Sequence, residues 1–464
     1  MSNRIDMHLD ERFYAISRLS KIHLNSDEKS KIQAFLEGIQ DSLEDQKSVF
    51  QYCLKFKLAP WIFLQLLQHN FLHLFSQEVI ALFEEEHGKI STQNSNRNEE
   101  AVRFLQKFED KGIEAIILKG NYFSHTIYKD VGYKRMNDFD MLIQAKRWGD
   151  IQDIFNELDY IPLGFGWTGE KQEPAKFSHV GTPFISNNFH CIIGTQWGLK
   201  SPTTRYSVRT EELWKDKSEF QFYEVPTYGL SPEHNLLHLI LHMGIYKCGI
   251  RDCMDVYNVW MSHEFDEDKL VELFTRAKAI EKAYFTLTLS NICSGVIPET
   301  LLEKLRTKSK NSFVVRRLAG RLKMIQKGHD LHSSYNDYFQ DIEKEVIYFN
   351  LYFEFHVKLK FYGKILQKTL FPDLTHSLKF LDKNYESPSF FTKLKGRLKA
   401  PYYIFSLIAE EIGWRFTMLL FFKLFFDLLF SIKNYFVKTE SYFDYLKNRG
   451  INPRDVQKCV QNVQ

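Results

Sequence analysis

The spacing of apolar residues divides the chain into a central mixed part and two helical flanks. Ahead of residue 100, apolar side chains recur at helical spacing, most clearly at Ile32, Phe35, Leu36 and Ile39. The run Ile113–Leu118 is short, apolar and rich in β-branched residues, which is typical of a buried strand. After Ser231-Pro232-Glu233, a typical helix start, helical spacing continues for most of the way to Gln464.

Around this strand, the pattern predicts the order strand, helix, loop, strand. The strand ends in Lys119-Gly120, and Asn121–Tyr128 then has apolar and aromatic residues at helical spacing. The polar stretch Val131–Asn137 predicts a loop, and Phe139–Ile143 is a second apolar run. Such an alternation indicates a compact sheet with a covering helix.

Further short elements are expected on both sides of these strands. Trp148–Leu158 is periodic as a helix, and Phe184-Ile185, Phe189–Ile193 and Phe220–Val225 suggest additional strands. The polar stretch Ser91–Glu100 is consistent with either a loop or the capped start of a helix. The elements together predict the α+β class.

The predicted architecture is a small mixed-sheet core at 101–230, flanked by a helical lead-in at 1–100 and a large helical region at 231–464. The length of 464 residues agrees with more than one compact unit. Lys and Arg number 61 against 58 Asp and Glu, so the overall charge is close to neutral and does not favour a nucleic-acid partner.

Cysteine usage and the first residues favour a cytoplasmic location. The six cysteines are scattered and form no C-x-x-C pair, which speaks against structural zinc or a disulfide scaffold. Residues 1–19 carry charges throughout and lack the apolar run of a signal peptide. Phe416–Val437 is long enough to span a bilayer, but Lys423 and Asp427 lie near its middle. We expect a buried or membrane-surface helix there, which leaves a peripheral membrane contact open.

Asp138 and Asp140 are the strongest candidates for chemistry. Two residues apart at the start of a strand, their side chains project to the same face. Neighbouring carboxylates repel unless a cation neutralises them, and Mg²⁺ is typically held by one or two carboxylates together with substrate phosphates. Lys119 and Arg135 would add positive charge, and Gly120 would let the backbone approach a phosphate. A lone D-x-D pair is more often a solvated turn, but here it opens an apolar strand.

These residues resemble the uncharacterised bacterial nucleotidyltransferases of the DNA polymerase β superfamily. The resemblance rests on LKG at Leu118–Gly120, YKDVGYK at Tyr128–Lys134 and RMNDFDML at Arg135–Leu142. It covers about Ala101–Pro162 and, more loosely, the helical stretch after Ser231. It implies binding of NTP and Mg²⁺ and transfer of a nucleotidyl group to an acceptor, such as a sugar, a peptide or another protein.

The resemblance also implies a role for each site residue. Asp138 and Asp140 would be catalytic and hold the metal. Lys119 and Gly120 would form the turn that binds the nucleotide, and Arg135 would face phosphate or brace the loop.

One departure from the family pattern concerns a third carboxylate, expected on a later strand in a segment similar to I-D-L-H-W. The local counterpart is Ile193–Trp197, where Gly194 and Gln196 stand in place of Asp and His. A catalytically impaired protein that binds or regulates, a pseudoenzyme, is therefore the alternative function. Asp252 or Asp255 could substitute for the missing acid.

Three other features admit a functional and a plainer interpretation. His234, His238 and His242 share one helical face and could bind a metal, but a buried or site-lining role is favoured. Gly164–Gly169 spells G-x-G-x-x-G without a clear preceding strand, which favours a loop. Lys393–Tyr403 could touch an anionic membrane or RNA, although a solvated helix face is the simpler interpretation.

Overall fold

The computed structural model describes residues 11–163, 179–200, 204–243, 249–309, 389–412 and 442–456, and the single positions Gly363, Trp414, Met418, Phe422, Leu429 and Cys459. The G-x-G-x-x-G stretch and most of Phe416–Val437 lie outside these residues. The chain divides into two compact units, each described by itself below. The first comprises residues 1–161, 184–199 and 207–332, and the second comprises 162–183, 200–206 and 333–464. The three-part division expected from the sequence stays a prediction.

Short helices at the N-terminus of the first unit pack against one another, as the helical lead-in predicts. Asn25 caps the second of them through a reciprocal pair with Glu28, in which each side chain accepts the other residue's backbone N–H. The elements are α1 (Glu11–Leu19), α2 (Ser26–Ile39), α3 (Leu43–Lys55), α4 (Ala59–Gln68) and the 3₁₀ turn η1 (Leu72–Leu74).

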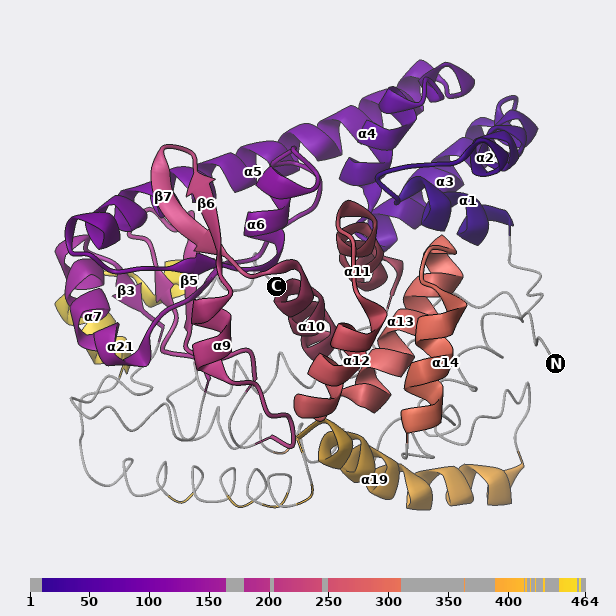
Figure 1. Ribbon diagram of the computed structural model, residues 1–464. Helices are drawn as coiled ribbons and strands as arrows, with labels where there is room; N and C mark the ends of the chain where they lie inside the picture. The colour runs from indigo at the N-terminus through magenta and orange to yellow at the C-terminus, as the bar shows by residue number, and fades with distance from the viewer. Residues whose placement is uncertain are drawn as a thin grey trace. The chain divides into compact units, whose positions relative to one another are not determined.

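Helix α5 (Gln77–Asp110) is long and connects these helices to the sheet (Figure 1). Phe83 and His87 in its first half contact α3 and α4, and Phe104 in its second half contacts the sheet. Both interpretations of Ser91–Glu100, as a loop or as a capped helix start, are wrong, because this stretch lies inside a helix that begins at Gln77. Four of its polar side chains are buried, namely Asn94, Arg97, Asn98 and Glu100, and the Asn94 amide donates to the carbonyl oxygen of Val131 at 2.6 Å. Asn94 is therefore polar because it forms hydrogen bonds with the backbone of a neighbouring loop, not because it contacts water.

A mixed sheet forms the centre of the first unit, with the strand order β3-β4-β5-β2-β1-β7-β6 among the described residues. β2 runs antiparallel to β1 and parallel to β5, and β1 runs parallel to β7. The bounds are β1 (Ile116–Ile117), β2 (Phe139–Leu142), β3 (Ile161–Pro162), β4 (Phe184–Ile185), β5 (Ile192–Gln196), β6 (Ser218–Phe222) and β7 (Val225–Gly229). The mixed sheet with flanking helical regions confirms the predicted α+β class.

Aromatic rings fill the space between the sheet and its helices. Phe104 of α5 packs edge-on against Phe139 of β2, with ring centroids 5.4 Å apart, and Phe139 packs in the same way against Phe222 of β6. Burying such rings removes a large apolar area from water, which stabilises the sheet on this face. The remaining elements of this part are α6 (Lys119–Thr126), η2 (Ala145–Arg147), α7 (Trp148–Glu157) and α9 (Thr210–Lys215).

A group of helices follows β7 in the first unit (Figure 1). Its members are α10 (Pro232–His242), α11 (Ile250–Ser262), α12 (Glu267–Arg276), α13 (Ile280–Ser294) and α14 (Glu299–Lys308). Ser231 caps α10 and Pro232 is its first residue, as predicted. Of the three histidines on α10, His234 and His238 are buried and His242 is exposed.

In the second unit, the described helices are α19 (Phe390–Ile412) and α21 (Tyr442–Asn448). Met418, Phe422 and Leu429, the described positions within Phe416–Val437, have exposed side chains. None of the helices among the described residues combines the length and apolar character needed to cross a membrane.

Candidate functional site

The two candidate carboxylates lie where β2 begins, next to the end of β1. The backbone N–H of Leu118 donates to the carbonyl oxygen of Asp140 at 3.0 Å, so the residue after β1 and the start of β2 are fixed side by side. Because β1 and β2 are antiparallel, the turn after β1 and the loop before β2 meet at one edge of the sheet. This topology brings Lys119, Asp138 and Asp140 together.

Lys119 neutralises Asp140 directly. Its ammonium Nζ lies 2.7 Å from Oδ2 of Asp140, and both side chains are largely buried. Burial alone would lower the pKa of the Lys119 ammonium, but the negative charges of Asp140 and Asp138 outweigh this effect and raise that pKa. The Lys119 backbone has φ of 53°, the left-handed region that a residue with a side chain seldom adopts.

Asp138 is the carboxyl whose ionisation is disfavoured. Burial and, next, the negative charge of Asp140 raise its pKa to about 6, against the opposing charges of Lys119 and Arg97. Its backbone carbonyl accepts a hydrogen bond from the Asn121 side chain at 3.0 Å. Without a further cation, this pair of carboxyls therefore holds its second negative charge weakly near neutral pH.

Strand β5 supplies the neighbours of Asp140 on the other side. In the parallel pairing of β2 and β5, Gly194 lies directly opposite Asp140. A Cβ atom added at Gly194 would collide with Oδ1 of Asp140, so residue 194 faces the carboxylates. Gln196 donates to the same Oδ1 at 3.2 Å. The position at which the family pattern expects a third acid is thus beside the pair, but this chain has no carboxylate there.

Gly120 lies under the loop that precedes β2. A Cβ atom at this residue would come within 3.1 Å of Cε of Lys134 and 3.3 Å of the side chain of Met136. The space freed by the missing side chain is therefore filled by these two residues. Close packing of the loop on the turn is one physical reason for glycine here, beside the predicted role of its backbone in binding nucleotide.

Buried polar residues of α5 hold this loop from one side. The Asn94 amide donates to the carbonyl oxygens of Val131 and Lys134, at 2.6 and 2.9 Å. Arg97 donates to Oδ1 of Asn94 at 2.7 Å, and its charge acts on Asp138. This arrangement connects the loop, the helix and the candidate site.

Helix α11 holds the same loop from the other side. Buried Asp255 accepts a hydrogen bond from the Tyr128 hydroxyl at 2.8 Å and pairs with the Lys134 ammonium. Arg251 donates to the carbonyl oxygen of Arg135 at 3.0 Å. Asp252 accepts from the backbone N–H of Gly249, near the start of the helix. Both acids proposed as substitutes for the third carboxylate thus have structural partners of their own.

Arg135 lies in this loop with a half-buried side chain. Within the part of the chain that the structure describes, its guanidinium forms no ion pair, and the cations that act on Asp138 are Lys119 and Arg97. Its predicted role toward phosphate stays a prediction. Arg97 was not among the residues singled out from the sequence, because it lies in a polar helical stretch 41 positions before Asp138.

The donor set of this site fits one metal ion together with a phosphate ligand. Over the described ranges, no group of three or more His, Cys, Asp or Glu side chains is placed to bind a metal. Mg²⁺ needs fewer protein ligands than that, since two carboxylates and phosphate oxygens or waters complete its octahedron. Asp138 and Asp140 provide hard oxygen ligands with excess negative charge, which the Lys119 ammonium neutralises in part.

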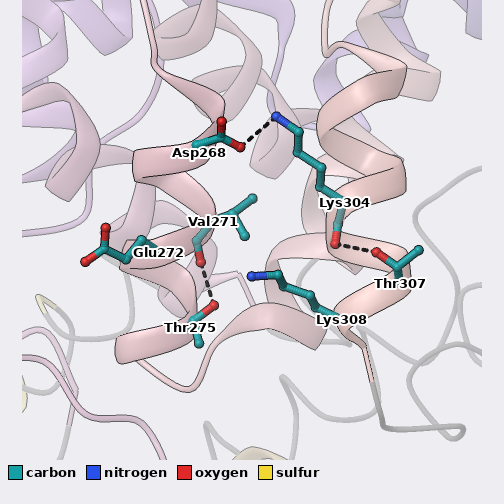
Figure 2. A pocket seen from close by; sticks show the side chains of 7 residues that line it. All are labelled: Asp268, Val271, Glu272, Thr275, Lys304, Thr307 and Lys308. Atoms are coloured by element: carbon teal, nitrogen blue, oxygen red, sulfur yellow. Dashed lines mark hydrogen bonds and ion pairs between the residues drawn. The ribbon is translucent and has the colours of Figure 1, made fainter.

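A pocket of about 370 Å³ lies between α12 and α14, away from the predicted site residues. Figure 2 shows the Lys304 ammonium bonded to Asp268 at 2.8 Å, with Lys308 extending between the two helices. The other lining residues are Val271, Glu272, Thr275 and Thr307. None of them belongs to the predicted site, and the paired lysine and aspartate match an ordinary solvated helix surface.

Comparison with protein families places most of the first unit in a described family. A family model described as an uncharacterised nucleotidyltransferase matches residues 42–295, which is more than half of the chain. The matched span includes α5, the sheet, the carboxylate pair and helices α10 and α11. No curated protein and no solved structure gives a significant match.

Proposed function

The chain belongs to the uncharacterised nucleotidyltransferase family, and we propose that it is a Mg²⁺-dependent enzyme that moves a nucleotidyl group from NTP to an acceptor. The observation that carries the proposal is the meeting of Lys119, Asp138 and Asp140 at one edge of the sheet, with the lysine ammonium 2.7 Å from Asp140. The proposal includes the DNA polymerase β superfamily fold, which the resemblance of the L-K-G turn and the R-x-x-D-x-D segment supports. It also includes a cytoplasmic location, which rests on the scattered cysteines and the charged first residues.

Each residue has a role that follows from its surroundings. A bound cation would lower the pKa of Asp138 from about 6 and so stabilise its ionised carboxylate, since a positive charge favours that form. Gln196 would keep Asp140 oriented through its hydrogen bond to Oδ1. Lys119 would turn from Asp140 toward the triphosphate. Asp138 and Asp140 would hold the Mg²⁺, which when bound would supply positive charge to offset that on the transferred group.

The acceptor is open to a sugar, a peptide or another protein. In two-metal transfer, a second cation activates the attacking oxygen, and the third acid of the family pattern would serve it. With Gly194 in that position, Asp138 and Asp140 would hold one cation, and one of these carboxylates would accept the proton of the attacking group as pyrophosphate leaves the NTP. We therefore expect slow transfer, limited by the nucleophile rather than by NTP binding.

Gly194 favours a second candidate function: a protein that binds NTP and Mg²⁺ but does not transfer the nucleotidyl group. Because residue 194 faces Asp140 directly, loss of an acid there removes a ligand from the site itself. Such a protein would use nucleotide binding for regulation. The two candidates share the binding step and differ in turnover.

Incubation with Mg²⁺ and NTPs radiolabelled at the α-phosphate separates the candidates, because the nucleotidyl group keeps this phosphate whereas the other two leave as pyrophosphate. The purified chain is compared with Asp138→Asn, Asp140→Asn and the control Asp153→Asn, an exposed residue of α7. Label that appears on an acceptor or on the chain, and disappears in the first two variants alone, supports the enzyme. Labelled NTP that stays bound to the wild-type chain without covalent transfer, and is lost in the first two variants, supports the second candidate. Absence of both from the wild type and all variants would contradict the two proposals together.

A further inference from the structure

Helix α19, outside the family match, exposes a stripe of large apolar side chains. Phe390, Leu394, Leu398 and Tyr402 recur at every fourth residue, and Phe391 lies beside them. All five are between 44% and 79% exposed. Single apolar residues are common on protein surfaces, but a contiguous group on one helix face marks an interaction site.

Basic residues border this stripe on both sides. At about 100° per residue, the five apolar side chains cover an arc of roughly 120°. Exposed Arg397 lies at one border, and exposed Lys395 and Lys399 lie at the other. Gly396, on the opposite side of the helix, is buried. The sequence has no Asp or Glu from Ser387 to Ala409, so this face carries charge of one sign.

We propose that this face of α19 binds the surface of an anionic lipid bilayer, with the helix axis in the plane of the membrane. The apolar arc would enter the boundary between headgroups and acyl chains. The basic side chains at its borders would extend to the lipid phosphates and carboxylates, because their long stems allow the charged ends to stay in water. An aromatic and leucine centre with cationic borders matches both chemical layers of such a surface.

The charge of the α19 face favours a lipid bilayer over a second copy of the chain as its partner. Two α19 helices packed through their apolar arcs would bring the basic borders together, and like charges at close range repel. Helices that associate with copies of themselves through an apolar face usually carry both acidic and basic residues beside that face, which form ion pairs between the helices. An anionic membrane supplies the opposite charge that this face lacks.

The apolar residues also argue against RNA. Binding of a single strand uses aromatic faces on which successive bases stack, next to a basic track. In α19, Leu394 and Leu398 occupy the centre of the arc, between Phe390 and Tyr402, and offer no stacking surface. Leucine at this position instead favours acyl chains.

Flotation of the full-length chain with lipid vesicles tests the proposal. Vesicles of phosphatidylcholine with phosphatidylserine are compared with vesicles of phosphatidylcholine alone, at low and high salt. We expect the chain to float with the anionic vesicles and to be released by salt. The proposal does not depend on nucleotide transfer, because no nucleotide is present.

Two variants at exposed positions of α19 identify the face. Combining Lys395→Gln, Arg397→Gln and Lys399→Gln removes three charges, each of which contributes about fivefold to partitioning, so binding should fall roughly a hundredfold. Combining Phe391→Ser and Leu398→Ser should abolish flotation while leaving the unfolding temperature unchanged. The control combines Lys29→Gln, Lys107→Gln and Lys269→Gln, all exposed and distant in sequence, and should float like the wild type.

Several outcomes would overturn the proposal. These are no flotation with anionic vesicles, flotation that both α19 variants retain, or equal loss in the control variant. Retention on poly(U) RNA in place of vesicles would assign the face to nucleic acid. A dimer in solution that the Phe391→Ser and Leu398→Ser variant dissociates, without any vesicle binding, would assign it to a second copy.

Discussion

Gly194 of β5 lies directly opposite Asp140 of β2, and a side chain at residue 194 would point at the Asp140 carboxylate. A carboxylate introduced at this position would therefore join Asp138 and Asp140 without any change in the backbone of the strand. The contact is with the end of a flexible side chain, which can rotate away. Because of the register between β2 and β5, a single substitution at Gly194 can place a third carboxylate beside Asp138 and Asp140.

Gly194→Asp should lower stability without metal and strengthen metal binding. Three carboxylates in one small volume repel, and the new side chain displaces Asp140, which together should cost about 1–3 kcal/mol in the free energy of unfolding. Mg²⁺ or Mn²⁺ should restore most of this loss. Thermal unfolding with and without metal measures the effect, and Gly88→Asp, at an exposed helical position with free space, serves as the control. A variant that gains no more from metal than the wild type would contradict the prediction.

Asp138→Asn should stabilise the metal-free protein at alkaline pH. Folding raises the pKa of Asp138 from 3.8 to about 6, so the folded state binds this proton more tightly than the unfolded state. The resulting stability is fully present below pH 3.8 and is lost as the pH rises to about 6. Above pH 6, the ionised carboxyl costs about 1–3 kcal/mol, which Asn avoids.

Urea unfolding at pH 4 and pH 8 checks this expectation. The variant and the wild type should differ little at pH 4, and the variant should be the more stable at pH 8. Mg²⁺ should reduce the difference at pH 8, because the cation stabilises the wild-type carboxylate. Equal stability of the two proteins at both pH values would show that Asp138 is not under electrostatic stress.

Strands β1 and β2 and the carboxylate pair were predictable because their signals are local, whereas the run Phe220–Val225, expected to be one strand, contains the turn between β6 and β7. Alternation of side chains places Asp138 and Asp140 on one face wherever a strand begins, and a short apolar run such as Ile113–Leu118 indicates a strand without any tertiary information. The pairing partner of a strand, in contrast, cannot be predicted from the local pattern of residues. That Gly194 would lie opposite Asp140 was suggested by resemblance, and only the sheet register shows it.

Contacts between distant segments account for what the sequence left open. Ser91–Glu100 suggested a loop or a capped helix start because polar residues usually face water, whereas Asn94 and Arg97 are buried and Asn94 bonds to the loop before β2. Asp255 follows Lys134 by 121 positions, and no spacing rule connects them. Buried polar pairs of this kind arise from tertiary packing, so local pattern cannot predict their partners.

Lys119→Met should weaken nucleotide binding more than it changes the fold. The substitution keeps most of the side-chain volume but removes the cation that neutralises Asp140, so the two carboxyls repel each other and the triphosphate loses a positive partner. We expect a loss of about 10- to 100-fold in NTP affinity, measured by calorimetry with Mg²⁺ present. Lys146→Met, at an exposed position in the same unit, is the control and should bind normally. Unchanged affinity in Lys119→Met would remove this residue from the proposed site.

Asp255→Asn should destabilise the protein through the loop rather than through the metal ligands. Asp255 is buried and pairs with Lys134, so its loss leaves a largely buried ammonium without its carboxylate, at a cost of about 3–5 kcal/mol. The variant Lys134→Met removes the other partner, and the double variant should recover part of the loss because neither charge is then left alone. Urea unfolding of the four proteins gives the interaction free energy directly. Additive losses in the double variant would show that the pair does not couple α11 to the loop that covers Gly120.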